Sequence, residues 1–203
     1  HWWDVTVNFL KDAGRYVIGF LIWVSFAMIY YKVSKYVVLI CLSPVMAFVS
    51  ERTEKELTGV EIPFSWRQFI KDVARGVIIA IRNLIVEITI IVVLGIFNLV
   101  VSFLFPPAAI ITTPLIAIIT FLVGAYYYGF STMDYTSERR KLSVGESIKY
   151  IRKYKGVAIA NGSIFTLWLI VPILGTYVGT IFAPITCTVG ATLAIHEMDS
   201  VRS

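Results

Sequence analysis

The segment 157–195 constrains the fold of this chain most, because its 39 residues include no Asp, Glu, Lys or Arg. An uncharged apolar run of about 18 residues or more is typical of a membrane-embedded segment. One straight helix of this length would be about 58 Å long, roughly twice the hydrocarbon thickness of a bilayer. We therefore expect the segment to fold back as a helical hairpin.

Pro172 and Gly175 mark the predicted turn of this hairpin, because proline removes a backbone donor and glycine readily adopts positive φ angles. The first limb, 157–171, has 15 residues and would be about 22 Å long. A spanning helix needs about 17 residues or more, so this limb is too short to cross. The lengths favour a hairpin that enters the membrane and returns, with broken backbone of the kind that lines a path or a site.

The composition of the whole chain supports the same class of protein. Of 203 residues, 58% are hydrophobic and 15% are charged, which predicts an all-α, polytopic helical integral membrane protein. We expect one membrane domain over residues 1–203. Cys41 and Cys187 lie in separate apolar runs without metal-ligand spacing, so we interpret them as buried thiols. Because the sequence starts at His1 rather than at methionine, we expect an upstream segment in the natural chain.

The first apolar run predicts a long transmembrane helix over 17–42, interrupted by Lys32 and Lys35. Lysines at such depth either extend their stems to an interface or line an ion path. Both readings remain open from the sequence.

Ser43 and Pro44 form a favourable helix start, so we predict that a new amphipathic helix begins there and lies at the membrane surface. Its apolar face includes Met46, and its polar face includes Ser50. Gly59 is predicted to follow its last turn as a C-terminal cap.

A second helical hairpin is predicted over 77–130, with its corner at Pro106 and Pro107. A capping-box pattern at 65–68 starts a basic interfacial helix that leads into this hairpin. The two hairpins share one plan: a polar entry, a proline-marked turn and a return.

The segment 131–156 is predicted to be a polar connector with a short basic surface helix. Ser143 and Glu146 form a capping-box pattern for that helix, and Gly156 forms a plausible stop. Basic loops stay on the cytoplasmic side of a membrane, so we place this connector and the C-terminus there. Its basic residues are Arg139, Arg140, Lys141, Lys149, Arg152, Lys153 and Lys155.

Three blocks of the sequence resemble the CysZ-type sulfate permeases of the wider etoposide-induced-protein membrane family. They are the segment 42–59, the central motifs 128–135, 139–143 and 150–156, and the C-terminal motifs 171–174 and 183–193. The resemblance implies a helical membrane fold with two hemi-penetrating hairpins, a homo-oligomer, and a place in the bacterial inner membrane. It also implies movement of sulfate into the cytoplasm for cysteine synthesis.

The sequence departs from the family pattern at two places. The family's Gly-Leu-Arg motif, which is associated with sulfate, has no counterpart here, so the resemblance carries over no sulfate-binding residue. After Asp134-Tyr135 the chain continues Thr-Ser-Glu, where many relatives have Pro and Asn. This second departure leaves open whether the chain moves sulfate.

Arg82 is the best candidate for contact with a permeating anion, because a guanidinium fork matches a tetrahedral oxyanion. The alternative is an ion pair with Glu87 or another helix. Asn98 is interpreted first as a helix–helix hydrogen-bonding residue. The proline corners are either pure turns or exposed helix ends that attract anions. The predicted anion path comprises Arg82, Asn98, Pro106, Pro107, Pro172 and Gly175.

The basic connector, through Arg139, Arg140, Lys141, Arg152 and Lys153, either concentrates anions or contacts anionic lipid heads. Within it, Asp134 and Glu138 are expected to cap a helix or pair with Arg139.

We find no catalytic cluster, metal-ligand spacing or nucleotide motif, and we expect no enzyme activity, no cofactor and no nucleic-acid partner. Two hypotheses follow: an oxyanion transporter, or a non-transporting protein of membrane interaction or organisation. A continuous polar track would favour the first, and a wholly apolar interior would favour the second.

Overall fold

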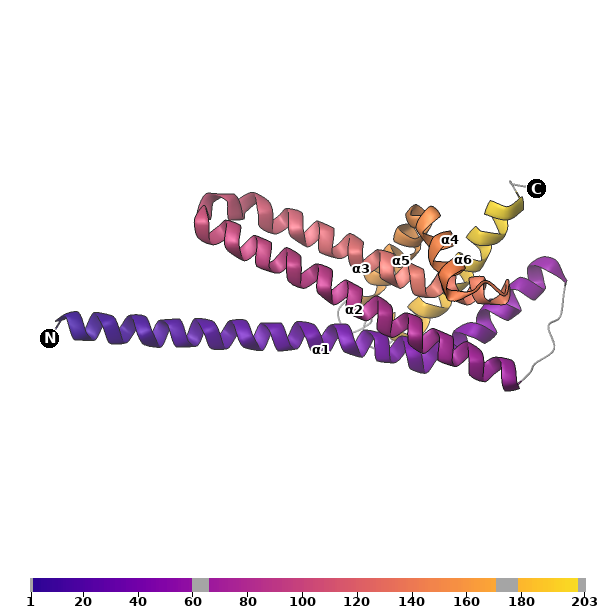
Figure 1. Cartoon of the computed structure of the whole chain (residues 1–203), viewed down its shortest axis with the longest axis horizontal. Coiled ribbons are helices and arrows are strands. Elements are labelled where there is room, and N and C mark those ends of the chain that lie inside the picture. Colours follow the sequence, from indigo (N-terminus) through magenta and orange to yellow (C-terminus); the bar gives the residue numbers. More distant parts are fainter. Residues whose placement is uncertain (1, 60–65, 171–178, 201–203) are drawn as a thin grey trace. The chain divides into compact units, whose positions relative to one another are not determined.

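The computed structural model describes residues 2–59, 66–170 and 179–200. Within these ranges the chain is helical and contains no strand, as an all-α protein requires. The elements, shown in Figure 1, are α1 (Trp2–Thr58), α2 (Trp66–Leu104), the short 3-10 helix η1 (Pro106–Ala108), α3 (Ala109–Arg139), α4 (Val144–Lys153), α5 (Lys155–Ile170) and α6 (Thr180–Ser200).

Four helical segments in the described part of the chain are long and apolar enough to cross a membrane. This confirms the prediction of an all-α, polytopic membrane protein. The segments are Val33–Thr58, Val73–Leu104, Pro106–Glu138 and Ile181–Ser200.

The chain divides into two compact units, residues 1–37 and 38–203. The first unit is the N-terminal part of α1, and apolar side chains such as Trp23, Phe26 and Tyr30 are exposed on it. The second unit holds the remaining helices and all the polar clusters described below. That the whole chain acts as one membrane domain stays a prediction.

Helix α1 passes through Pro44 without interruption, so the prediction of a new helix at Ser43 is wrong. A proline inside a helix costs about 3 kcal/mol, because it removes a hydrogen bond and crowds the preceding turn. Leu39 and Met46 are buried on either side of it, and each buried side chain of this size contributes about 1.5–3 kcal/mol. Packing on both sides of the proline therefore offsets its cost.

The C-terminal end of α1 confirms one sequence prediction and corrects another. Gly59 has a φ of +71°, and its N–H donates to the Lys55 carbonyl at 2.8 Å, as expected of a C-terminal glycine cap. Ser50, predicted on the polar face, is fully buried. Its hydroxyl lies 3.4 Å from that of Thr192 on α6, so a polar partner explains the burial.

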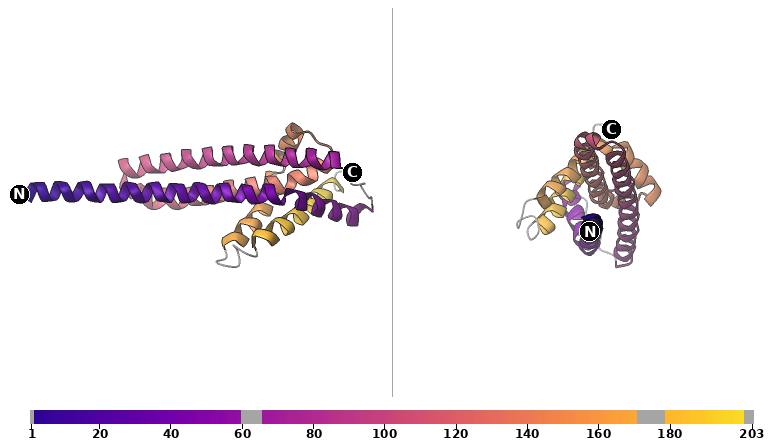
Figure 2. Two further views of the ribbon diagram at one scale, coloured as in Figure 1. Left: turned by 90° about the horizontal axis from the view of Figure 1, so that it is seen from below. Right: turned by 90° about the vertical axis from the view of Figure 1, so that its left-hand side faces the viewer.

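The predicted hairpin with a corner at Pro106 and Pro107 is confirmed. Helices α2 and α3 run side by side, and η1 makes the turn between them (Figure 2). With 39 and 31 residues, both limbs exceed the length of about 20 residues that a crossing needs. By contrast α5 has 16 residues, in line with the short limb predicted from the sequence. The turn at Pro172 and Gly175 lies outside the described residues, and hemi-penetration of either hairpin stays a prediction.

Helices α3 and α5 cross with their backbones in close contact. A Cβ built on Gly129 would lie 1.8 Å from the Ala158 carbonyl oxygen, and one on Gly162 would lie 1.8 Å from the Ala125 carbonyl oxygen. Each helix thus contributes a small residue, three intervening residues and a glycine, the pattern that lets membrane helices approach closely.

The core of residues 38–203 lies where α2 begins and α3 ends, and the other end of the α2–α3 hairpin is mostly exposed. Helices α5 and α6 pack against this part of α3. The core therefore sits beside the polar residues of the candidate site. Its fully buried members are Ile79, Phe130, Met133, Ile151, Ala158, Ala191 and Ile195.

The predicted capping box at Ser143 and Glu146 is confirmed at the start of α4. The Ser143 N–H donates to the Glu146 carboxylate at 2.8 Å, and the Glu146 N–H donates to the Ser143 hydroxyl at 3.3 Å. Gly156 does not end this helix, because α4 ends at Lys153 and Gly156 belongs to the first turn of α5. Residues 131–139, predicted as a connector, are the last turns of α3.

Candidate functional site

The end of α3 carries a dense set of buried polar side chains. The seven residues from Ser131 to Ser137 cover about 10 Å of helix, and all of them are buried. Hydroxyl groups in this stretch donate to carbonyls of the preceding turn, as Ser131 does to Tyr127 at 3.0 Å and Ser137 to Met133 at 3.1 Å. Because a run of Ser, Thr and Asp is typical of a loop, the sequence analysis predicted a connector here and missed this buried polar cluster.

An ion pair between Arg75 of α2 and Asp134 of α3 closes one side of the cluster. The guanidinium donates to both carboxylate oxygens, at 2.9 and 3.3 Å, and the two side chains are 13% and 3% exposed. Ser147 of α4 also donates to Asp134, and Arg75 donates to the Leu142 carbonyl. This pair therefore has its charges and hydrogen bonds satisfied.

Asp134 thus pairs with Arg75 of α2. The side chain of Arg139 lies outside the described ones, so the predicted pairing of Asp134 or Glu138 with Arg139 stays a prediction.

Amides and hydroxyls continue the cluster across α5, α6 and the end of α1. Asn161 donates to the Thr132 hydroxyl and to the Cys187 carbonyl, both at 2.9 Å. The Thr192 hydroxyl lies 3.0 Å from that of Thr136 and 3.4 Å from that of Ser50. Two buried groups of hydrogen bonds thus join α3 to α5 and α6, and α3 to α6 and α1, and they exclude a wholly apolar interior.

Arg82 of α2 lies one side chain away from Ser131, the first residue of the buried polar stretch of α3. Its guanidinium donates to the Asn83 side-chain oxygen at 2.9 Å, and Asn83 donates to the Ser131 hydroxyl at 3.4 Å. The guanidinium carbon is 5.5 Å from the centre of the Phe130 ring, a cation–π contact. No carboxylate within the described ranges pairs with Arg82, in contrast to Arg75. Contact with an anion and an ion pair with another helix both stay predictions for Arg82.

Aromatic side chains of α3 pack together beside Arg82, which lies over the Phe130 ring. The Tyr126 ring packs edge-on to Tyr127, with centroids 5.1 Å apart, and to Phe130 at 6.1 Å. Arg152, predicted for the basic connector, is exposed in the last turn of α4.

Asn98 makes the helix–helix hydrogen bonds predicted for it. It accepts from Thr112 at 2.8 Å and donates to Thr113 at 3.3 Å, across the α2–α3 hairpin. It lies 16 residues beyond Arg82 on α2, about 24 Å along the helix. Asn98 and the corner prolines are therefore not part of the cluster around Arg82. Pro172 and Gly175, the other predicted members of the path, lie outside the described residues.

The remaining basic residues of the connector serve different contacts. Arg140 pairs with Asp199 of α6, which joins the ends of α3 and α6. Lys141 is exposed at a positive φ of 57° in the turn before α4, and Lys153 lies 5.5 Å above its neighbouring Tyr154 ring. Arg139 is the last residue of α3. The connector is therefore not one uniform basic surface.

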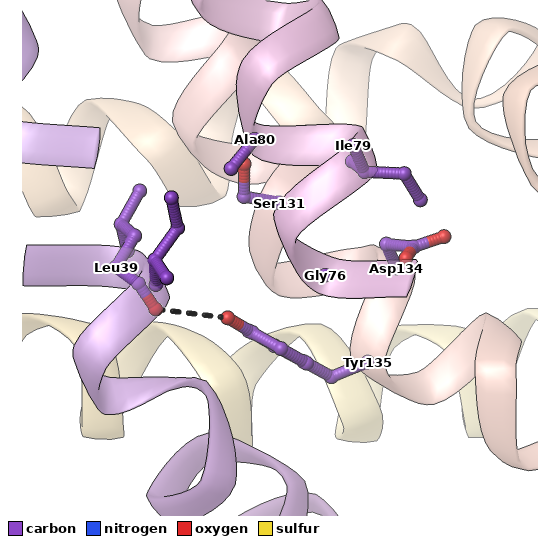
Figure 3. A pocket seen from close by; sticks show the side chains of 8 residues that line it. Leu39, Gly76, Ile79, Ala80, Ser131, Asp134 and Tyr135 are labelled. Carbon is purple, nitrogen blue, oxygen red and sulfur yellow. Dashed lines mark hydrogen bonds between the residues drawn. The ribbon is translucent and has the colours of Figure 1, made fainter. Parts of the chain in front are cut away.

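A small cavity lies beside the ion pair, between α1, α2 and α3 (Figure 3). Its volume is about 10 Å³, which is room for about one water molecule. The Tyr135 hydroxyl borders it and donates to the Leu39 carbonyl at 3.5 Å. A tetrahedral oxyanion does not fit here, and Asp134 in the lining would repel it. The lining residues are Leu39, Ile40, Gly76, Ile79, Ala80, Ser131, Asp134 and Tyr135.

Membrane-length helices around a buried polar network define a polytopic helical membrane protein. Residues 1–178 match the family described as sulfate transporter CysZ/etoposide-induced protein 2.4. The chain belongs to this family, which confirms the resemblance found in the sequence. A comparison with curated proteins found no match.

Proposed function

We propose that this protein carries sulfate or a similar small oxyanion across the bacterial inner membrane into the cytoplasm, where it serves cysteine synthesis. The observation that carries the proposal is Arg82, a cation inside the candidate span Val73–Leu104 with no described carboxylate partner. An arginine at membrane depth costs about 2.5–3.5 kcal/mol on insertion scales and marks an ion path by default. Membership of a family named for a sulfate transporter agrees with this assignment.

The buried network beside Arg82 supplies the rest of the support. Its amides and hydroxyls lie on the inner faces of four helices, from Asn83 to Thr192. Such groups can replace part of the hydration of a passing ion. The remaining elements of the proposal are one membrane domain that forms a homo-oligomer, with basic loops in the cytoplasm and with lipid around the apolar helix faces. We assign no enzyme activity to it.

The test is uptake of radiolabelled sulfate into proteoliposomes that contain the full-length protein. We expect saturable uptake that selenate competes for and chloride does not. Arg82→Gln should lower this uptake. Arg52→Gln is the matched control, because Arg52 is exposed and pairs with Glu56 of its own helix at 3.1 Å.

Uptake equal to that of empty liposomes, from protein shown to be folded, would overturn the transport proposal. It would favour the second hypothesis, a protein of membrane interaction or organisation. Uptake that is unchanged by Arg82→Gln would keep transport and remove Arg82 from the path.

A further inference from the structure

Pro44 leaves one backbone carbonyl of α1 without its usual donor. In an α-helix each carbonyl accepts from the N–H four residues further on, and proline has no N–H. The Ile40 carbonyl therefore lacks the donor that position 44 supplies in a regular helix. Ile40 lies in the candidate span Val33–Thr58, where lipid offers no replacement. A carbonyl freed in this way needs a neighbouring helix, a side chain or an ordered water as its partner.

A hydroxyl one turn away is also without a partner. The Ser43 hydroxyl makes no hydrogen bond within the described residues, although Ser43 is only 3% exposed. It lies against Gly76 of α2, because a Cβ built on that glycine would be 4.0 Å from the Ser43 hydroxyl oxygen. Buried hydroxyl groups are almost always hydrogen-bonded, to protein or to ordered water. Two neighbouring polar groups of α1 thus call for the same kind of partner.

The small cavity of Figure 3 lies at this place. Ile40 and Gly76 both line it, and its volume of about 10 Å³ has room for about one water molecule. Tyr135 of α3 borders it, and its hydroxyl is 3.5 Å from the Leu39 carbonyl, longer than the usual distance of about 2.5–3.0 Å. The Tyr135 hydroxyl is therefore only weakly engaged. A buried water needs two to four polar partners, and the two helices offer that number.

The charges beside the cavity favour a neutral ligand. Asp134 lines it, and the Arg75 guanidinium holds both oxygens of that carboxylate, at 2.9 and 3.3 Å. Asp134 would repel an anion, and Arg75 would repel a cation. Water alone can both donate to the Ile40 carbonyl and exchange hydrogen bonds with hydroxyl groups.

We infer that one ordered water molecule binds in this cavity. It donates to the Ile40 carbonyl and bonds to the hydroxyls of Ser43 and Tyr135. The water thereby joins the proline-containing turn of α1 to α3, and it satisfies polar groups that lie inside membrane-length helices. Gly76 provides the space, since a side chain at that position would occupy the cavity. The inference concerns the fold and does not depend on what the protein carries.

Gly76→Ala tests the inference through the sign of its effect on thermal unfolding of the full-length protein in detergent. The added Cβ would come no closer than 3.7 Å to another atom, so it fits without a clash but takes space in the cavity. In a dry cavity, the better packing and the higher helix propensity of alanine would raise the midpoint temperature. Displacement of a water would leave buried polar groups unpaired, so we expect the midpoint to fall by about 2–6 °C.

Two further variants identify the groups that hold the water. Ser43→Ala should also lower the midpoint, because it removes one partner of the water, whereas loss of an unpaired hydroxyl would raise it. Pro44→Ala restores an N–H for the Ile40 carbonyl, so Gly76→Ala should cost less in that background than in the unchanged protein. Gly95→Ala is the matched control, since its Cβ would meet no atom within 4 Å, and its midpoint should be unchanged or slightly higher.

Radiolytic footprinting detects the water directly. Hydroxyl radicals formed by X-rays from a bound water label the side chains beside it, even where bulk solvent has no access. Tyr135 is 7% exposed and Phe130 is 1% exposed, and only Tyr135 borders the cavity. We expect Tyr135 to be labelled several times faster than Phe130 in the unchanged protein, and at a rate close to that of Phe130 in Gly76→Ala.

Three results would each overturn the inference. The first is a midpoint for Gly76→Ala that rises as much as that for Gly95→Ala. The second is labelling of Tyr135 that is as slow as that of Phe130 in the unchanged protein. The third is a cost of Gly76→Ala that is the same with and without Pro44, since the Ile40 carbonyl would then not bind the water. Sulfate uptake does not enter any of these measurements, so failure of the proposed function would leave them as they are.

Discussion

Arg75 and Asp134 form a two-pronged ion pair, with guanidinium nitrogens 2.9 and 3.3 Å from the two carboxylate oxygens, although 59 positions separate them in the sequence. The pair joins the start of α2 to the end of α3, and Ser147 brings the start of α4 to the same carboxylate. It is the point at which three helices meet. Arg82, two turns further along the same helix, has no such partner among the described carboxylates. Arg75 therefore stabilises the fold, whereas Arg82 is a candidate for binding an anion.

Asp134→Ala should strongly destabilise the protein. It leaves the Arg75 guanidinium buried without its carboxylate, and the loss of one member of a buried pair costs about 3–5 kcal/mol. Thermal unfolding in detergent should show a clear fall in the midpoint temperature. Glu56→Ala is the control, because its pair with Arg52 is exposed and should contribute only about 0–1 kcal/mol. Equal midpoints for the two variants would show that the Arg75–Asp134 pair does not stabilise the fold.

Gly162→Ala should disrupt the crossing of α3 and α5. The added Cβ would lie 1.8 Å from the Ala125 carbonyl oxygen and 2.7 Å from the Gly129 nitrogen, and both are backbone atoms that cannot turn away. Overpacking of this kind costs about 1–3 kcal/mol or more, so we expect a lower yield of folded protein and a lower unfolding temperature.

Gly95→Ala is the matched control for the crossing. It also lies inside a helix, but its Cβ would meet no atom within 4 Å. Alanine is the better helix former by about 1 kcal/mol, so this variant should be unchanged or slightly more stable. A Gly162→Ala protein as stable as the Gly95→Ala protein would contradict the close approach of the two helices.

The sequence was sufficient where the determinants of structure are local. The corner at Pro106, the capping box at Ser143 and the glycine cap at Gly59 each depend on a few adjacent residues, and all three are as predicted. The end of α3 was misread because Ser, Thr and Asp favour turns. Here their hydroxyls bond to carbonyls one turn back, and burial by distant helices keeps them helical.

The candidate site shows the same division between local and distant information. Arg82 was singled out as a guanidinium in an apolar helix, and it is placed beside the polar network. Its contact with the Phe130 ring could not be predicted, because 48 positions separate the two residues and only the packing of α2 against α3 brings them together. The same reason hid the pairing of Arg75 with Asp134. Hydropathy indicates which helices enter a membrane, but not which of their polar residues meet.

The cap of α4 should weaken in acid. The Ser143 hydroxyl and its backbone N–H donate to the Glu146 carboxylate, and these bonds lower the pKa of Glu146 below its ordinary value of 4.5. Because the folded pKa is the lower one, the stabilisation is complete above the ordinary value and is lost as the pH falls through the folded value. Amide hydrogen exchange of α4, corrected for intrinsic rates, should therefore show less protection as the pH is lowered from 6 to about 3.

Glu146→Gln separates this effect from general acid unfolding. Glutamine can still accept from Ser143 in a capping box but does not titrate. Its α4 should keep the same protection across this range of pH. If α4 lost protection equally in both proteins, the acid effect would come from another group.

Asn98→Ala should loosen the α2–α3 hairpin without changing sulfate affinity. Its amide bonds to Thr112 and Thr113, and hydrogen bonds between membrane helices contribute about 0.6–2 kcal/mol. We expect a modest fall in the unfolding temperature, measured in detergent. Thr89→Ala is the control, since that exposed hydroxyl donates only to Ile85 of its own helix and its loss should change the unfolding temperature little. A large loss of sulfate binding or uptake in Asn98→Ala, at unchanged stability, would instead restore Asn98 to the anion path and show that the path extends along the hairpin beyond Arg82.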